Sequence, residues 1–194
     1  SGRAISSEES ASLIKWLEVN SLRTVRNRAI FYLLFGCGLR RAEVCELRVK
    51  QVSFKNRSAK IIGKGNKERT IYFPDAVDEV LKIWFEFRQL NKNDIDAGFV
   101  FGRIDNRQHL HLDIPLDPSS VTRIIEKLVA ETENLEGRLT PHDLRRTFAT
   151  RLISKNVDIV EVQKLMGHAS VATTGNYVRK DEENLRKAAE KAEL

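Results

Sequence analysis

The sequence predicts a mainly α-helical domain with one small antiparallel β-sheet, an α+β architecture. Apolar residues recur at helical spacing through most of the chain, and β-rich runs are concentrated in residues 52–73. Capping side chains, glycine and proline stand where the periodic segments begin and end. The 194 residues, 41% of them hydrophobic, suffice to bury one core, and the chain contains no internal repeat or long linker.

The chain is expected to begin with helices. Ser6 and Glu9 have the spacing of a capping box, which predicts that a helix opens there. A second helix follows Thr24 and ends at residues 36–38, where two glycines permit a sharp turn. Residues 41–47 are predicted to form a short third helix.

Three β-rich runs then interrupt the helical pattern. They cover residues 52–54, 58–62 and 69–73, and short polar segments separate them. This arrangement predicts a small antiparallel sheet with a cationic loop, residues 63–67, at one end. Pro74 is suited to the first turn of the helix that follows.

The remainder of the chain is predicted to be helical, apart from a short buried strand at residues 99–101 and an irregular stretch over residues 103–114. Four helices are expected to begin at Asp117, Thr140, Asp158 and Ser170 and to end near Leu128, Ser154, Met166 and Tyr177. Gly167 would end the third of them. Residues 182–194 form a last helix.

Composition excludes several classes of protein. The 33 Lys and Arg outweigh the 27 Asp and Glu, for a net charge of +6, and nowhere do about 18 apolar residues run together as a membrane span requires. The N-terminus lacks the apolar stretch of a signal peptide. Two cysteines, Cys37 and Cys45, are too few for a disulfide framework or a zinc site, and they fit a reduced intracellular setting as packed thiols.

The positive charge is concentrated in one segment. Residues 38–70 hold ten basic and three acidic side chains, a balance of +7 that exceeds the charge of the whole chain. The acidic segment 75–96 follows it. This charge distribution favours a basic face that binds phosphate groups and an acidic face that is exposed to solvent. A solvated surface with unevenly distributed charge would give the same numbers of basic and acidic residues.

No metal or nucleotide motif withstands inspection. The pair His109 and His111 lacks further ligands and is expected on a loop surface. Lys64 lies between two glycines, but the helix and Ser/Thr of a phosphate-binding loop do not follow it. The other candidate functional residues are cationic and polar side chains at the ends of predicted helices and in turns. Each of them alone is only weakly informative about function.

Together these groups resemble a known family. The segments GLRRAEV, GKGNKER, TPHDLRRTFAT and LMGHASVATTGNY, in this order, are similar to the motifs of the tyrosine recombinase catalytic domain, and the closest wording is of the Xer type. The resemblance covers residues 6–179 and implies the tyrosine recombinase fold for residues 1–180. Members also carry an N-terminal core-binding domain, which this chain starts too late to contain.

The resemblance implies a reaction and the residues that perform it. Tyr177 would attack the scissile phosphate and form a 3′-phosphotyrosyl linkage, and strand exchange through a Holliday junction would need neither metal nor ATP. Arg40 and Arg145 would hold the non-bridging oxygens, a task that suits planar guanidinium groups. Lys64 would protonate the leaving 5′-oxygen, with Lys67 as a competing candidate in the same loop.

Further residues would support this chemistry. His142 would help accept the tyrosine proton or orient the phosphate, His168 would bind a non-bridging oxygen, and Glu43 would hold the Arg40 region in place. Four other arginines are expected to contact DNA phosphates without sequence specificity. They are Arg41, Arg69, Arg146 and Arg151.

The same resemblance suggests partners. The protein would act in the cytoplasm, associated with the nucleoid, on a double-stranded recombination site and without a cofactor. Residues 181–194 would pack as a helix on a neighbouring copy in a homotetramer or heterotetramer, with accessory proteins possible. A frayed terminus is the alternative for this short, alanine-rich segment.

Two other functions stay open at this stage. A type IB topoisomerase shares the chemistry and relaxes supercoils without a defined site, and a DNA-binding module could have lost catalysis. The wording of the motifs argues against the first, and the presence of all six expected catalytic residues argues against the second. Chromosome or plasmid dimer resolution and integration or excision of a mobile element are not separated by the sequence.

Overall fold

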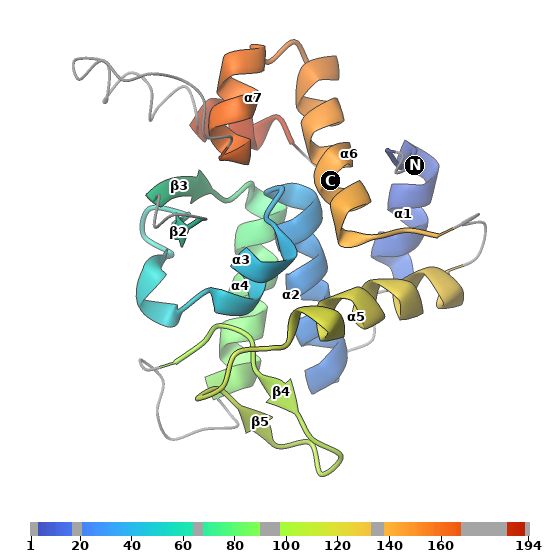
Figure 1. Cartoon of the computed structure of the whole chain (residues 1–194), viewed down its shortest axis with the longest axis vertical. Helices are drawn as coiled ribbons and strands as arrows, with labels where there is room; N and C mark the ends of the chain where they lie inside the picture. The colour runs from blue at the N-terminus through green and yellow to red at the C-terminus, as the bar shows by residue number, and fades with distance from the viewer. Residues whose placement is uncertain are drawn as a thin grey trace.

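The computed structural model describes residues 4–16, 21–63, 68–89, 98–132, 138–167 and 186–192. Its helices and strands, in chain order, are α1 (Ser7–Trp16), α2 (Leu22–Gly36), α3 (Arg41–Glu46), the 3₁₀ turn η1 (Val49–Gln51), β1 (Val52–Ser53), β2 (Ser58–Ile62), β3 (Glu68–Tyr72), α4 (Asp75–Gln89), β4 (Arg103–Ile104), β5 (Leu110–His111), α5 (Pro118–Glu131), α6 (Pro141–Ser154) and α7 (Ile159–Met166). The α+β class predicted from the sequence is confirmed. In Figure 1, α6 and α7 lie at one end of the molecule and the β4–β5 pair at the other.

Helix α2 forms the centre of the core. Every residue from Ala29 to Gly36 is buried, and the helix packs against α4, α5 and α6. It begins at Ser21, whose hydroxyl accepts from the Thr24 amide at 3.2 Å, so it starts earlier than expected. Across the core, the indole of Trp84 on α4 donates to the Val100 carbonyl at 2.9 Å, which leaves its one polar atom satisfied. Within the described residues, no helix has the length and apolar character needed to cross a membrane.

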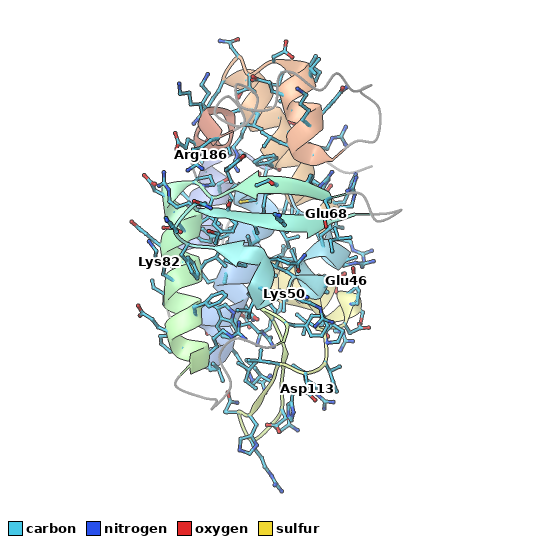
Figure 2. All side chains as sticks on the ribbon, turned by 90° about the vertical axis from the view of Figure 1, so that its left-hand side faces the viewer. Glu46, Lys50, Glu68, Lys82, Asp113 and Arg186 are labelled. Carbon is cyan, nitrogen blue, oxygen red and sulfur yellow. The ribbon has the colours of Figure 1, made fainter. Side chains whose placement is uncertain are left out.

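The predicted antiparallel sheet is present, with strand order β1-β2-β3. Ala59 lies opposite both Val52 and Ile71, and it is buried together with Ile61 on one face of β2. Figure 2 shows the sheet facing the viewer with α4 beside it. The loop that joins β2 to β3 is therefore anchored at Ile62 and Glu68, which pair across the two strands.

The region after α4 differs from the prediction in two ways. Phe99 makes an isolated bridge to Arg48, so the strand expected at residues 99–101 is absent. Residues 103–111, expected to be irregular, contain the β4–β5 pair, with Arg103 opposite His111. Asp105 stabilises the turn between these strands, because its carboxylate accepts from the amides of Arg107 and His109 at 2.8 and 2.9 Å.

The helix caps are confirmed. Ser6 and Glu9 exchange two hydrogen bonds of 2.8 and 3.1 Å, as a capping box requires. Asp117 and Asp158 each accept from a backbone amide in the first turn of α5 and α7. Gly167 ends α7 in the left-handed conformation, with a φ of 62°.

The described part of the C-terminal segment packs on its own chain. Residues 186–190 are helical, and Ala188 and Ala189 are buried, as is Ala192. Glu190 pairs with Arg57 at 3.3 Å, and the guanidinium of Arg186 lies 5.0 Å from the centre of the Tyr72 ring. The other side chains of this apolar cluster come from β3, from α6 and α7, and from the turn between these two helices: Tyr72, Phe148, Leu152, Val157, Val162, Leu165 and Met166. The predicted brief helix at residues 170–177 lies outside the described residues.

The turn between α2 and α3 depends on Gly38, which leads to a prediction. Its φ is 62°, and a Cβ at this position would lie 2.4 Å from a ring carbon of buried Phe148. We expect Gly38→Ala to lower the free energy of unfolding by about 2–4 kcal/mol. The substitution places a residue with a Cβ in the left-handed conformation, and it also forces a methyl group against the Phe148 ring. Urea unfolding measures the change. In a Phe148→Leu background, the same substitution should cost about 1 kcal/mol, and an unchanged midpoint for Gly38→Ala alone would contradict the prediction.

Candidate active site

Glu43 lies at the centre of the predicted site. It occupies the first turn of α3, where backbone amides have no partner within the helix, and it accepts from the Arg40 amide at 2.7 Å. Its side chain is only 5% exposed. The short helix α3 therefore begins with a carboxylate folded back over the residue that precedes it.

Two arginines share this carboxylate. Arg40 donates from Nη1 to Oε1 at 2.9 Å, while Arg69 on β3 donates to Oε1 and Oε2 at 2.7 and 2.8 Å. With the Arg40 amide on Oε2, each oxygen of Glu43 accepts two hydrogen bonds, which fills the capacity of a carboxylate. The paired, parallel bonds of Arg69 are the stronger arrangement.

The electrostatics of Glu43 follow from these contacts. Burial by itself would raise the pKa of the carboxyl, but the hydrogen bonds and charge of Arg69, followed by the hydrogen bonds of Arg40, outweigh it and lower the pKa from 4.5 to about 2. Glu43 is therefore ionised at neutral pH.

Arg145 lies beside this group and is buried. Thr140 and Asp143 cap α6 with a reciprocal box, and the helix carries Arg145 inward from there. Its Nη1 donates to the Gly38 carbonyl and its Nη2 to the Met166 carbonyl. Burial, followed by the charge of Arg40, lowers its pKa from 12.5 to about 10, so it stays positively charged at neutral pH.

The C-terminal end of α7 receives all three guanidinium groups. Arg69 donates from Nε to the Leu165 carbonyl at 3.2 Å, Arg145 to Met166, and Arg40 from Nη2 to Gly167 at 3.5 Å. The last carbonyls of a helix lack partners within it, and the negative end of the helix dipole favours cations there. Three arginines from α6, β3 and the start of α3 are thus brought together at one helix end.

Other predicted residues lie around this centre. His142 is exposed in the first turn of α6, and Arg146 is exposed in the same helix. Arg41 is exposed too, and it donates to the Thr122 hydroxyl at 2.7 Å, which joins α3 to α5. Four predicted residues lie outside the described part of the chain: Lys64 and Lys67 between β2 and β3, His168 directly after Gly167, and Tyr177.

Two arginines expected to contact DNA phosphates have their guanidinium groups engaged inside the protein. Arg69, with a side chain 12% exposed, is held by Glu43 and Leu165. Arg151 donates to the Phe35 carbonyl at 2.6 Å and lies 3.9 Å from the centre of that ring. The sequence offers no sign of either contact, because each joins residues far apart in the chain.

The structure offers no metal centre within the described residues, where no group of three or more His, Cys, Asp or Glu is arranged to hold an ion. His109 and His111 both face Asp105, at 3.4 and 3.3 Å, on the exposed β4–β5 turn. Cys37 and Cys45 are buried free thiols, as predicted, and burial raises the pKa of Cys45 to about 12.

Comparison with known proteins identifies the family. The profile of the Phage integrase family matches residues 3–184. The chain belongs to the phage integrase family. Tyrosine recombinase XerA of Pyrococcus furiosus is 34% identical to it over 181 residues, which are 93% of this chain and 59% of that protein.

Solved structures of this family share its fold. The crystal structure of XerA recombinase matches with a TM-score of 0.72 and 26% identity, over 94% of this chain and 58% of the other. XerH recombinase in a post-cleavage complex with a palindromic difH substrate matches with a TM-score of 0.69 and 26% identity, over 97% of this chain and 52% of the other. This phage integrase family chain thus spans little more than half the length of these relatives, and the motif resemblance to tyrosine recombinases is confirmed.

The low pKa of Glu43 predicts how stability depends on acid. The folded protein binds this proton more weakly than the unfolded chain, so the stabilisation is complete above pH 4.5 and is lost as the pH falls toward 2. The full effect is about 3 kcal/mol. Urea unfolding of wild type and Glu43→Gln at pH 7 and pH 3 tests it.

The difference between these two proteins should be largest at pH 7 and should shrink at pH 3. Glu126→Gln, which removes a surface carboxylate paired with Arg138 at 3.0 Å, is the matched control and should change stability little at either pH. A constant difference between wild type and Glu43→Gln across this range would contradict the assignment of the low pKa to Glu43.

Proposed function

We propose that the protein is a site-specific DNA recombinase that cleaves and rejoins strands through a tyrosine-linked intermediate. The observation that carries this proposal is the cluster of Arg40, Arg69 and Arg145 around one carboxylate, Glu43, which leaves a net charge of +2 at the end of α7. Preorganised cations stabilise the charge that develops on a phosphate during its transfer. Membership in the family and the DNA substrate of the similar XerH structure support this choice.

The reaction is proposed to proceed by transesterification. The Tyr177 oxygen attacks the scissile phosphorus and forms a phosphotyrosyl bond as the bond from phosphorus to the 5′-oxygen breaks. His142 accepts the tyrosine proton, and Lys64 gives a proton to the leaving oxygen, with Lys67 as the alternative donor. A 5′-hydroxyl from a partner strand then reverses the step. The first round of exchange forms a Holliday junction, and the second round resolves it.

The exposure of Arg40 and Arg145 supports a different proposed role for each arginine. Arg40 has a side chain 43% exposed, so its guanidinium is open to a DNA phosphate, whereas Arg145 is buried beside it. Arg40 would bind a non-bridging oxygen directly. Arg145 would bind the second oxygen once DNA covers the site, and His168 would add a hydrogen bond.

Tyr177→Phe tests the proposed nucleophile. The substrate is a nicked duplex that loses its short 5′-hydroxyl fragment on cleavage, with a target site selected by the protein from randomised DNA. Wild type should accumulate a covalent adduct at the 3′-phosphate, and Tyr177→Phe should form none, because phenylalanine lacks the attacking oxygen. Denaturing gel electrophoresis measures the adduct. Adduct formation by Tyr177→Phe would refute the assignment, and relaxation of random plasmid by wild type would favour topoisomerase activity.

We also propose that the protein assembles as a tetramer on two recombination sites, in the cytoplasm and on nucleoid DNA. The C-terminal segment buries an alanine stripe on its own chain, and a neighbouring copy presents the same apolar cluster. An exchange of this segment between copies would therefore conserve its contacts while linking the subunits. Dimer resolution and mobile-element exchange both use such an assembly.

Deletion of residues 182–194 tests the role of the segment. The truncated protein should bind a single site but form fewer higher complexes, because the cluster around Phe148 and Leu165 loses its cover and the link between copies is removed. Light scattering on DNA carrying one or two selected sites measures complex size. Arg138→Gln serves as the control, and an unchanged complex size with unchanged recombination would contradict the proposal.

A further inference from the structure

Arg69 is the residue that joins the separate parts of the site. It lies on β3, directly after the loop that carries Lys64, and it contacts both the start of α3 and the end of α7. Its side chain is 12% exposed, against 43% for Arg40. These contacts place its charge behind the exposed arginine and not on the surface that DNA would meet.

Arg40 and Arg69 share the hydrogen-bond acceptors of the Glu43 carboxylate unequally. Arg69 takes both carboxylate oxygens, at 2.7 and 2.8 Å, while the side chain of Arg40 takes one, at 2.9 Å. The second amino group of Arg40 reaches only the Gly167 carbonyl, at 3.5 Å. Without Arg69, Glu43 would be free to pair one-to-one with Arg40 and to occupy the donors that a phosphate needs.

Arg69 also packs closely against the C-terminal end of α7. A Cβ on Gly167 would lie 2.8 Å from Cδ and 2.9 Å from Nε of Arg69, so the arginine stem passes directly against the glycine. The same Nε donates to the Leu165 carbonyl at 3.2 Å. The Arg69 side chain therefore holds the Gly167 turn in place from one side.

We propose that Arg69 is a positioning residue for strand cleavage, which holds Glu43 and the Gly167 turn so that Arg40 meets the phosphate, without touching DNA itself. This inference rests on the proposed recombinase function. It replaces the expectation, drawn from charge alone, that Arg69 binds a DNA phosphate.

Arg69→Gln and Arg69→Lys test the proposal in single-turnover cleavage of the nicked duplex. We expect both variants to cleave bound DNA about 10–100-fold more slowly, because small displacements of catalytic groups cost that much. Lysine retains the charge but cannot span both carboxylate oxygens, so Arg69→Lys should recover little. The dissociation constant for the duplex and its dependence on salt should stay at the wild-type values.

Two further variants define the route of the effect. Glu43→Gln combined with Arg69→Gln should slow cleavage by less than the product of the two single effects, because part of the action of Arg69 passes through that carboxylate and the rest through the Gly167 turn. Arg138→Gln removes an exposed arginine that pairs with Glu126, and it should cleave at the wild-type rate. Thermal unfolding shows whether each variant is folded at the assay temperature. If Arg69→Gln is unfolded, the test uses Arg69→Lys alone, because lysine keeps the aliphatic stem and the charge.

The opposite result is equally distinct. Weaker duplex binding, with a salt slope smaller by about 1 and normal cleavage of bound DNA, would identify Arg69 as a phosphate ligand and overturn the proposal. Wild-type cleavage by Arg69→Lys would overturn it too. If wild type itself forms no adduct, the proposed recombinase function fails, and binding of inorganic phosphate, followed through the Arg40 side-chain NMR signal, tests the positioning role separately. Arg69→Lys, which keeps the charge, should then bind phosphate about fivefold more weakly, because Glu43 becomes free to pair with Arg40, and unchanged affinity would overturn the proposal.

Discussion

One shared carboxylate holds the proposed active site together. Glu43 binds Arg40 and Arg69 at once. These two arginines and Arg145 donate hydrogen bonds to the carbonyls of the last two residues of α7 and of Gly167, which follows it. Three guanidinium groups repel one another and are costly to bury, so each needs a fixed acceptor. The carboxylate and the helix end supply those acceptors, and in doing so they connect α3, β3, α6 and α7, which are distant in the chain.

The apolar core fixes where these charged groups meet. The buried helix α2 ends in a turn at Gly38, whose carbonyl accepts from Arg145 and whose Cα lies against Phe148. Phe148, Leu165 and Met166 also belong to the cluster that covers the alanine stripe of residues 186–192. The C-terminal segment and the arginine cluster therefore contact the same residues at the end of α7: the segment packs on their side chains, and the arginines bind their carbonyls. A change in how that segment packs would act on the elements that hold Arg69 and Arg145.

Local chemistry made much of the fold predictable. Ser6, Thr140 and Asp158 each cap a helix as expected, because the pattern of a helix start lies within four residues of sequence. The β-rich runs between short polar segments likewise predicted the sheet. The β4–β5 pair could not be predicted, since strands of two residues are too short to show a period. The apolar run from Phe99 to Phe101 predicts a strand but forms a loop with one isolated bridge, because a buried loop and a buried strand are equally apolar.

The family, the capped helices and the concentration of positive charge in residues 38–70 are all predictable from the sequence, since each is carried by short motifs or by composition. The partners of the individual arginines are visible only in the folded protein. Arg69 and Arg151 resemble phosphate-binding arginines in sequence, yet one is held by Glu43 and the other by Phe35. A guanidinium takes whichever acceptor the fold brings near it, and acceptors 26 and 116 residues away leave no trace in the sequence around each arginine.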